Sequence, residues 1–400
     1  MPTFKRFWLA PTLGAMLTSA HAAPFSTVYT FSGKDDGATP KAGLVAYKGA
    51  LYGTTFEGGP DCFSQSNCNG TIFRFDPETG NLKTVYAFTG NDDGESPSAP
   101  VCFFGGQIYG TTSNFGNLSG TVFQIDPKTG TQKTLHTFTN GSDSSYPIAG
   151  VSFHAGKMFG TTAGVDDGTY MGSVFQWDPT SQQFTTLYGF SPDYPSPSSP
   201  MGGVAFRGSK VYGTTSSGGA VLPTGFGCGI IFQIDPDTKA FRTIHEFIRD
   251  DGCIPTGDLL NVSGNFYGTT SEGGANNYGT VFRFNPVTRK LASLHSFNLT
   301  DGAYPRAGLI LHGGFLYGTT AGISTDGTPN GNGTVFRLNP RTKVLKTLYT
   351  FAGSDDGANP LGALVEYGNA LYGTTSTKGA QGNGTVFRID LPKPASDEGL

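Results

Sequence analysis

The sequence predicts an all-β fold, a single β-propeller of seven blades with four antiparallel strands in each blade. Three observations carry this prediction. A series of short motifs recurs seven times, each recurrence contains four short strand patterns, and a spare strand near the N-terminus matches a strand that the last recurrence lacks. The 60 glycines and 32 phenylalanines among 400 residues suit many tight turns and half-buried strands.

The first motif of the repeat is an aromatic residue followed by Gly-Thr-Thr. Its copies lie 50 to 57 residues apart and begin at Tyr52, Tyr109, Phe159, Tyr212, Tyr267, Tyr317 and Tyr372. A Gly-Thr-Val-Phe motif or a close variant follows each copy after a variable loop, and an Asp-Pro or Asn-Pro pair comes next in six of the copies. Self-similarity at a nearly fixed period indicates a repeat architecture.

Each unit reads as four strands with no helical period. In the first unit, strands A to D are expected at residues 43–47, 51–55, 71–75 and 82–88. The Asp-Pro-Glu-Thr-Gly segment between strands C and D predicts a turn, because aspartate bonds the backbone, proline fixes φ and glycine supplies a positive φ. The glycine inside Tyr-Gly-Thr-Thr is expected to admit a neighbouring backbone, since glycine otherwise weakens a strand.

The two ends of the repeat array favour a closed ring over an open stack. Strand D of the first unit contains Thr-Val-Tyr-Ala-Phe, and a match, Thr-Val-Tyr-Thr-Phe, stands alone at residues 27–31. The seventh unit stops after strand C, at Asp390, and lacks its own strand D. An N-terminal strand that joins the last blade would close the ring and remove exposed strand edges. An open solenoid would instead carry polar caps at both ends.

The first 22 residues are expected to be a secretory signal peptide, followed by the propeller over residues 23–392 and a short tail over residues 393–400. Lys5 and Arg6 form a charged start, and Ala20-His21-Ala22 matches a cleavage site after an apolar stretch. A buried N-terminal helix is the alternative. No other apolar run approaches membrane length, so we expect a secreted chain, extracellular or periplasmic, with no membrane span. The formal net charge of -4 argues against nucleic acid as a partner.

Five cysteines in an exported chain predict disulfides. Cys62 and Cys68 lie in one loop and are expected to pair, and Cys228 and Cys253 are a second candidate pair. Cys102 would then remain a small buried thiol inside a strand. Metal binding is the alternative, but the sequence shows neither a Cys-x-x-Cys motif nor a nearby histidine.

The Tyr-Gly-Thr-Thr, Gly-Thr-Val-Phe and Asp-Pro-x-Thr-Gly series resembles the GloVer tandem-repeat family of exported bacterial proteins. The resemblance covers nearly all of the chain after the expected signal peptide. It implies an extracellular propeller-like array and brings no established activity or catalytic residues. Family members often end in a surface-anchoring segment, and the tail over residues 393–400 does not match one.

The loops predict which rim of the ring carries function. In a blade of this order, the variable B–C loops share one rim with the D–A loops, and variable loops on a rigid scaffold are common binding sites. Aromatic side chains of the B–C loops could stack on sugar rings, although the favoured alternative is that they pack the loops themselves. These candidate ligand-binding residues are Phe56, Phe63, Phe115, Tyr170, Phe226 and Tyr278.

The D–A loops carry a repeated Asp-Gly pair. The aligned aspartates are Asp36, Asp93, Asp143, Asp251, Asp301 and Asp356, and an aligned proline follows in all seven loops. One hypothesis is a ring of carboxylates that holds Ca²⁺ or a cationic ligand. The alternative, favoured by the repetition itself, is that each aspartate caps a turn between blades. No other cofactor is evident.

No catalytic motif is visible in the sequence. His136, His245 and His295 occupy a strand D position that is tyrosine in other units, which favours a packing role over catalysis. An enzyme on the same rim could still use scattered loop residues, and the candidates are Glu57, Asp166, Asp167 and Tyr170.

The leading functional hypothesis is a secreted, monomeric propeller that binds extracellular polysaccharide or surface protein through the rim of B–C and D–A loops. A polysaccharide lyase or glycoside hydrolase acting on the same rim is one alternative, and a structural or protein-interaction scaffold is the other.

Overall fold

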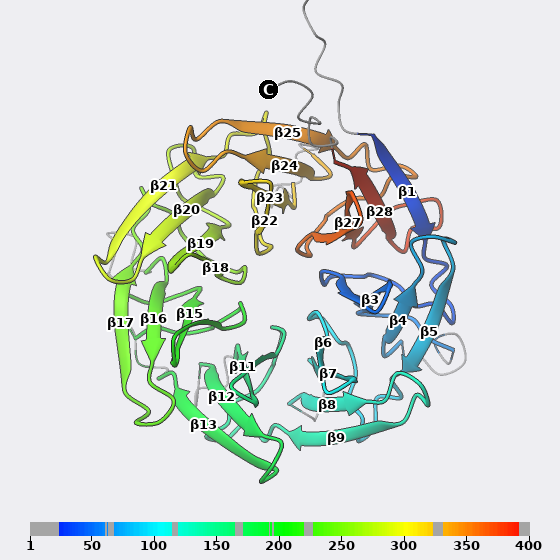
Figure 1. The fold of residues 1–400 in the computed structure, drawn as a ribbon, viewed down its shortest axis with the longest axis horizontal. Helices are drawn as coiled ribbons and strands as arrows, with labels where there is room; N and C mark the ends of the chain where they lie inside the picture. Colours follow the sequence, from blue (N-terminus) through cyan, green and yellow to red (C-terminus); the bar gives the residue numbers. More distant parts are fainter. Residues whose placement is uncertain are drawn as a thin grey trace, which may run out of the picture.

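Seven four-stranded antiparallel sheets surround a common axis in the computed structural model of the protein (Figure 1). The structure describes residues 24–60, 62, 68–113, 119–164, 171–191, 193, 196–219, 227–322 and 331–391. The predicted signal peptide, residues 1–22, and the tail, residues 393–400, lie outside this part of the chain. Over the described ranges we find no helix long and apolar enough to cross a membrane. The seven-bladed all-β propeller predicted from the sequence is confirmed.

Each blade runs from strand A beside the axis to strand D at the outer edge. Blade 1 contains β2 (Val45–Tyr47), β3 (Ala50–Thr55), β4 (Thr71–Phe75) and β5 (Leu82–Ala87). Blade 2 contains β6 (Cys102–Phe104), β7 (Gln107–Thr112), β8 (Thr121–Ile125) and β9 (Gln132–Thr137). Blade 3 contains β10 (Ser152–His154), β11 (Lys157–Thr162), β12 (Ser173–Asp178) and β13 (Gln183–Gly189). Blade 4 contains β14 (Ala205–Arg207), β15 (Lys210–Thr215), β16 (Ile230–Ile234) and β17 (Phe241–Glu246).

The remaining blades continue the same order. Blade 5 contains β18 (Leu260–Val262), β19 (Asn265–Thr270), β20 (Thr280–Asn285) and β21 (Lys290–Ser296). Blade 6 contains β22 (Ile310–His312), β23 (Phe315–Thr320), β24 (Thr334–Leu338) and β25 (Leu345–Thr350). Blade 7 contains β26 (Val365–Tyr367), β27 (Ala370–Thr375) and β28 (Thr385–Asp390), with β1 (Phe25–Thr30) as its outer strand.

The N-terminal strand closes the ring, as predicted. β1 pairs antiparallel with β28, so that Thr27 lies opposite Phe387 and Thr30 opposite Thr385. The predicted strand limits differ slightly from the observed ones. Strand A of blade 1 begins at Val45 rather than at residue 43, because the preceding backbone bonds the neighbouring blade: the carbonyl of Ala42 accepts a hydrogen bond from Thr374.

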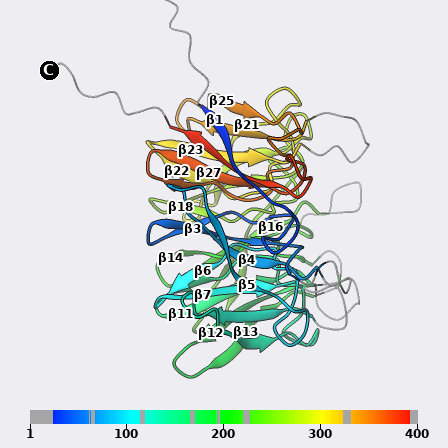
Figure 2. The same cartoon turned by 90° about the vertical axis from the view of Figure 1, so that its right-hand side faces the viewer.

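The strand order places the B–C and D–A loops on one rim, the long-loop rim, and the A–B and C–D turns on the other, the short-turn rim. Figure 2 shows the ring edge-on, with the strands running between the two rims. The A–B turn of blade 1 is a two-residue turn in which Lys48 and Gly49 both have positive φ, 45° and 78°. Such turns match the twist of paired strands.

The glycine of each Tyr-Gly-Thr-Thr motif makes room for an aromatic ring. A Cβ atom at Gly53 would lie 2.4 Å from the ring of Phe73, which faces it across the strand pair β3–β4. Gly213 has the same relation to Phe232, also at 2.4 Å. Both phenylalanines are fully buried. The expectation that this glycine admits a neighbouring backbone is therefore wrong, because the close partner is a side chain of the same blade.

The first threonine of the motif joins neighbouring blades. Its hydroxyl donates to a backbone carbonyl at the start of the next blade over 2.9 to 3.3 Å at six boundaries, Thr54 to Ala99, Thr111 to Ala149, Thr161 to Gly202, Thr269 to Ala307, Thr319 to Gly362 and Thr374 to Ala42. We call these bonds the threonine latches. At the boundary between blades 4 and 5, both candidate partners are described, and Thr214 makes no such bond to Gly257.

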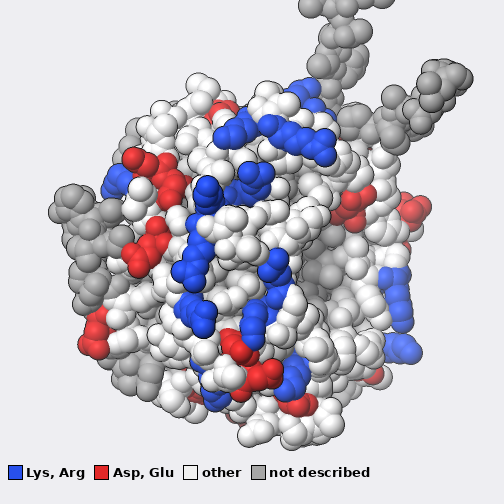
Figure 3. All heavy atoms as spheres, turned by 60° about the vertical axis from the view of Figure 1, so that its left-hand side comes forward, with Lys and Arg blue, Asp and Glu red and all other residues white. Residues whose placement is uncertain are grey.

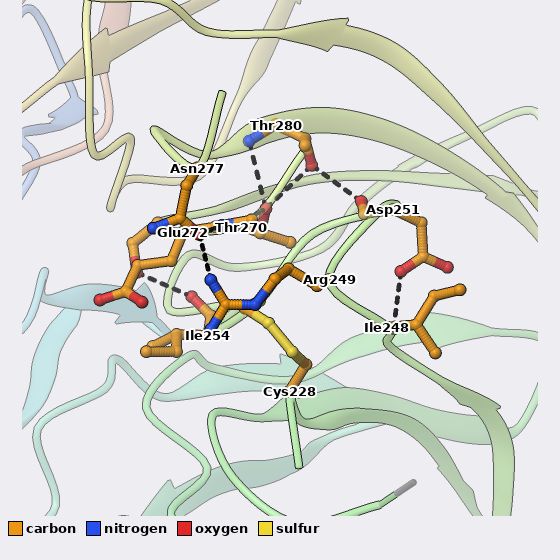
Figure 4. The surroundings of a disulfide bond; sticks show 12 residues. Cys228, Ile248, Arg249, Asp251, Ile254, Thr270, Glu272, Asn277 and Thr280 are labelled. Carbon is orange, nitrogen blue, oxygen red and sulfur yellow. Dashed lines mark hydrogen bonds between the residues drawn. A yellow bond between two sulfur atoms is a disulfide. The ribbon is translucent and has the colours of Figure 1, made fainter. Parts of the chain in front are cut away.

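A disulfide spans the boundary that lacks a latch. Cys228, just before strand C of blade 4, is bonded to Cys253 in the loop that enters blade 5. Figure 4 shows this bond beside Arg249, which donates to Asn277 over 2.9 Å. The second predicted disulfide, Cys62–Cys68, lies within the B–C loop of blade 1. Both predicted pairs are present, and Cys102 is a free, half-buried thiol whose pKa is raised by burial.

Removing the Cys228–Cys253 bond should lower stability more than removing the Cys62–Cys68 bond. The closed loops span sequence separations of 25 and 6 residues. Loop entropy then assigns roughly 3 kcal/mol of unfolding free energy to the long loop and roughly 2 to the short one. Only the long loop joins two blades. Denaturant unfolding of the double variants Cys228→Ser/Cys253→Ser and Cys62→Ser/Cys68→Ser measures the difference, and a larger loss in the second variant would contradict this assignment.

Candidate functional site

The aligned aspartates of the D–A loops hold their own turns. In each loop, one carboxylate oxygen accepts a hydrogen bond of 2.8 to 3.0 Å from a strand D side chain, in the pairs Tyr29–Asp36, Tyr86–Asp93, His136–Asp143, His245–Asp251, His295–Asp301 and Tyr349–Asp356. A backbone N–H at the start of the same loop also donates to the carboxylate, as Thr89 does to Asp93 over 2.9 Å. The carboxylates are therefore engaged within their separate loops.

These pairs explain why one strand D position is tyrosine in some blades and histidine in others. Either ring can present a hydrogen-bond donor to the aspartate. Burial, together with the bond to Asp356, raises the pKa of Tyr349 to about 12, so the phenol keeps its proton. Burial lowers the pKa of His136, and Asp143 opposes that shift. Within the described residues, no group of three or more His, Cys, Asp or Glu side chains is placed to share a metal ion.

Two of the six candidate aromatic residues lie in the described part of the chain. Phe56 is half-buried, and the Lys41 ammonium lies 3.1 Å from the centre of its ring, a cation–π contact. Tyr278 is half-buried beside Tyr304, with the ring centres 5.9 Å apart. These two residues belong to blades 1 and 5 and do not form one platform. Phe63, Phe115, Tyr170 and Phe226 lie outside the described residues, as do Asp166 and Asp167.

A cavity of about 120 Å³ lies on the axis of the ring and receives residues from all seven blades. In each blade, the lining residues follow the aligned proline of the D–A loop, so the cavity opens toward the long-loop rim. A second cavity, of about 450 Å³, is lined by residues within and just before strand A of blades 1 to 3 and by Asp258. It also includes Cys102, which therefore borders open space rather than lying in a closed core. The two cavities share Pro100, Gly150 and Asp258.

We call the two cavities together the channel. The residue directly after each aligned proline forms its mouth ring. Its members are Lys41, Ser98, Ile148, Met201, Thr256, Arg306 and Leu361. All seven are different residue types, whereas the next position is always alanine or glycine. Where that small residue is glycine, the fold requires it: a Cβ at Gly257 would lie 2.6 Å from the backbone of Ala307 in the next blade. The fold fixes the neighbours of the mouth ring and leaves the mouth ring itself free to vary.

The chemistry of the mouth ring is divided between two sides. Arg306, Leu361 and Lys41 come from consecutive blades 6, 7 and 1, so both cations lie on one side. Ile148 and Met201, from blades 3 and 4, make the facing side apolar. Burial lowers the pKa of Lys41, and the nearby carboxylate of Glu57 opposes this effect. Such a mouth can hold a ligand that has an anionic group at one end and an apolar face at the other.

Asp258 is the one carboxylate that lines the described channel. The corresponding positions of the other blades are Gly43, Pro100, Gly150, Gly203, Gly308 and Ala363. Asp258 is exposed to the open space of the channel, and the blades that line the channel surround it. Burial raises the pKa of Asp258, and a 2.6 Å hydrogen bond from the backbone N–H of Gly203 opposes that shift. Sequence reasoning missed both Asp258 and the mouth ring, although the complete set of aligned prolines marks their position.

Comparisons with known proteins describe the repeat and the fold. A family model described as the Gloeobacter/Verrucomicrobia repeat matches residues 14–225 and 199–397. Comparison with curated proteins finds no match. Among solved structures, an oligogalacturonate lyase in complex with manganese has a TM-score of 0.59 at 10% identity, covering 94% of this chain and 95% of that one. An oligogalacturonate lyase from Vibrio parahaemolyticus has a TM-score of 0.57 at 11% identity over the same shares. At these identities the likeness concerns the fold alone.

Replacing Asp258 by asparagine should stabilise the protein at neutral pH. The pKa of Asp258 is higher in the folded state than in the unfolded state, so ionisation of this carboxyl group destabilises the fold at pH values above the unfolded-state pKa. At lower pH, Asp258 is protonated in both states and this cost is absent. Asparagine keeps the acceptor for the Gly203 N–H. The gain in melting temperature of Asp258→Asn should therefore be largest near pH 8 and shrink toward pH 4. A gain that is independent of pH would contradict the assignment.

Proposed function

Because this chain belongs to the Gloeobacter/Verrucomicrobia repeat family, and its repeats differ at every position of the mouth ring, we propose that it is an exported propeller that binds an extracellular acidic saccharide at the channel mouth. The mouth ring is the observation that carries the proposal. A ring with a purely structural role would repeat its side chains as the latches do. Seven different side chains on one invariant frame are what recognition of an asymmetric ligand requires.

The chemistry of the mouth supports an anionic sugar as the ligand. Lys41 and Arg306 can bind a carboxylate, and arginine can do so through two parallel hydrogen bonds. Ser98 and Thr256 offer hydroxyl groups, and Ile148 and Met201 offer an apolar surface for a sugar face. Two disulfides support export, because such bonds persist in oxidising compartments.

A lyase or hydrolase acting at the same place is the alternative, and Asp258 is the observation that favours it. A carboxyl group with a raised pKa inside a channel has the character of a general acid. Incubation with oligogalacturonate, followed by assays for unsaturated uronyl groups and for new reducing ends, separates this alternative from binding. Binding without product supports the proposal, and product formation that is lost in Asp258→Asn supports the enzyme.

Loss of the two mouth cations should weaken binding of acidic oligosaccharides. In the variant Lys41→Met/Arg306→Leu, the mouth receives side chains that the ring already carries at Met201 and Leu361, so the fold should be kept. Hydrogen bonds to charged groups contribute about 1.5 kcal/mol or more each, so we expect affinity for oligogalacturonate to fall at least roughly tenfold. Isothermal titration calorimetry measures this affinity.

The matched control is Lys83→Gln/Lys133→Gln, which removes two exposed cations from β5 and β9, away from the mouth. It should bind oligogalacturonate as the parent protein does. Equal losses in both variants, or equal binding of a neutral cello-oligosaccharide by the parent protein, would overturn the proposal.

A further inference from the structure

Four blades carry arginine at the same position of strand C, but only two of them neutralise it. In blade 1, Arg74 pairs with Asp76 at 3.7 Å, and in blade 7, Arg388 donates to Asp390 over 2.7 Å. Blades 5 and 6 have Arg283 and Arg337 at this position, followed two residues later by Asn285 and Asn339. The acidic partner of the arginine is thus replaced by a neutral one in two adjacent blades.

The asparagines keep the structural part of the aspartate's role. Asn285 Oδ1 accepts hydrogen bonds from the backbone N–H groups of Val287 and Thr288, both at 3.0 Å. Asp76 makes the same bonds in blade 1, to Glu78 and Thr79. The turn therefore forms with either residue, and the change from aspartate to asparagine removes a negative charge without removing a structural contact.

The same C–D turns carry cations at a position that favours glycine. Blades 1 and 2 have Gly80 and Gly130 there, with φ of 72° and 71°. Blades 5 and 6 have Arg289 and Lys343, with φ of 55° and 60°. A left-handed conformation is unfavourable for a residue with a Cβ atom. Blades 3 and 4 also have residues other than glycine at this position, Gln182 and Lys239.

These four cations and three more from the same turns and the starts of β21 and β25 form the basic strip. Its members are Arg283, Arg289, Lys290, Arg337, Arg341, Lys343 and Lys346. Figure 3 shows basic side chains gathered on the side of the ring that holds these blades. Across the described residues from 283 to 346, the only acidic residue is Asp301, which lies in a D–A loop on the other rim and is bonded to His295. Lys343 additionally donates to the carbonyl of Ser293 in blade 5 over 3.1 Å.

We propose that the basic strip binds a linear anionic polysaccharide that lies across the C–D turns of blades 5 and 6. Because the strip repeats one arrangement, a strand C arginine followed by turn cations, in two successive blades, it fits a polymer whose negative charges also repeat. The exposed large apolar residues of these two turns are Val287, 69% exposed, and Val344, 65% exposed. They offer little surface for insertion into a bilayer, which favours a polysaccharide over anionic lipid. The strip is on the short-turn rim and is independent of the mouth ring.

The first test restores the charge pattern of the sister blades. In Asn285→Asp/Asn339→Asp, each arginine regains the carboxylate that Arg74 and Arg388 have, and the turns keep their caps. We expect binding of alginate, a polyuronate, to weaken about fivefold in low salt, and the parent protein to lose affinity as salt screens the strip. The control Lys83→Gln/Lys133→Gln also lowers the net charge by two and should bind alginate like the parent protein.

A second variant separates binding from folding. Arg289→Gly/Lys343→Gly gives both turns the residue of blades 1 and 2, relieves the left-handed strain and removes two cations. Alginate binding should fall by a similar factor while the melting temperature holds or rises. Both strip variants are also made in the background of the mouth variant Lys41→Met/Arg306→Leu, which removes the cations of the mouth. The loss of alginate binding caused by the strip variants should persist there, so failure at one site is distinguishable from failure at the other.

Three outcomes would overturn the proposal. One is unchanged alginate binding in the two strip variants. Another is an equal loss in the Lys83→Gln/Lys133→Gln control, which would show that only net charge matters. The third is capture of the parent protein by vesicles of phosphatidylglycerol and phosphatidylcholine without binding to alginate, which would assign the strip to a membrane surface.

Discussion

The contact between strand B of one blade and the first residues of the next is the constraint on which this propeller depends. At each latch, a buried threonine hydroxyl reaches a backbone carbonyl of an alanine or glycine beside the axis. Where that residue is Gly362, a Cβ atom would lie 2.4 Å from the backbone of Ala42 in the next blade. The hydroxyl is desolvated, so loss of its acceptor would leave a buried polar group unsatisfied. The ring closes through the same bond, from Thr374 to Ala42, that joins most of its internal boundaries.

The boundary between blades 4 and 5 shows what happens when this contact is missing. Thr214 makes no latch there, and strand C of blade 4 begins with Ile230 instead of the threonine or serine of the other blades. The Cys228–Cys253 disulfide and the bond from Gly203 to Asp258 join the two blades instead. The covalent bond and the unusual carboxylate therefore occur together at the most divergent boundary. The missing threonine latch and the carboxylate that lines the channel are consistent with a boundary whose residues serve ligand recognition instead of the contacts repeated at the other boundaries.

The sequence was sufficient for the fold because a propeller repeats its requirements. Seven aligned glycines, prolines and threonines predicted the blades, and the spare strand at residues 27–31 predicted the closure. The partners of repeated residues were harder to predict: the glycine of Tyr-Gly-Thr-Thr faces Phe73 and its equivalents, a contact that depends on register across two strands. The mouth ring was missed for a related reason. Alignment of repeats emphasises what is constant, and the mouth-ring residues share only their position after a proline.

The two rims of this protein differ in local charge, and the net charge of the whole chain describes neither rim. The formal net charge of -4 describes a weakly acidic chain. Six of its aspartates, however, lie in D–A loops where a tyrosine or histidine and a backbone N–H already satisfy the carboxylate. On the short-turn rim, the asparagines of blades 5 and 6 remove carboxylates from beside arginines that keep their charge. Because surface potentials are screened within about 10 Å at 0.1 M salt, a ligand at that rim meets the local cations and not the average of the chain. A weakly acidic propeller can thus present a basic surface to a polyanion.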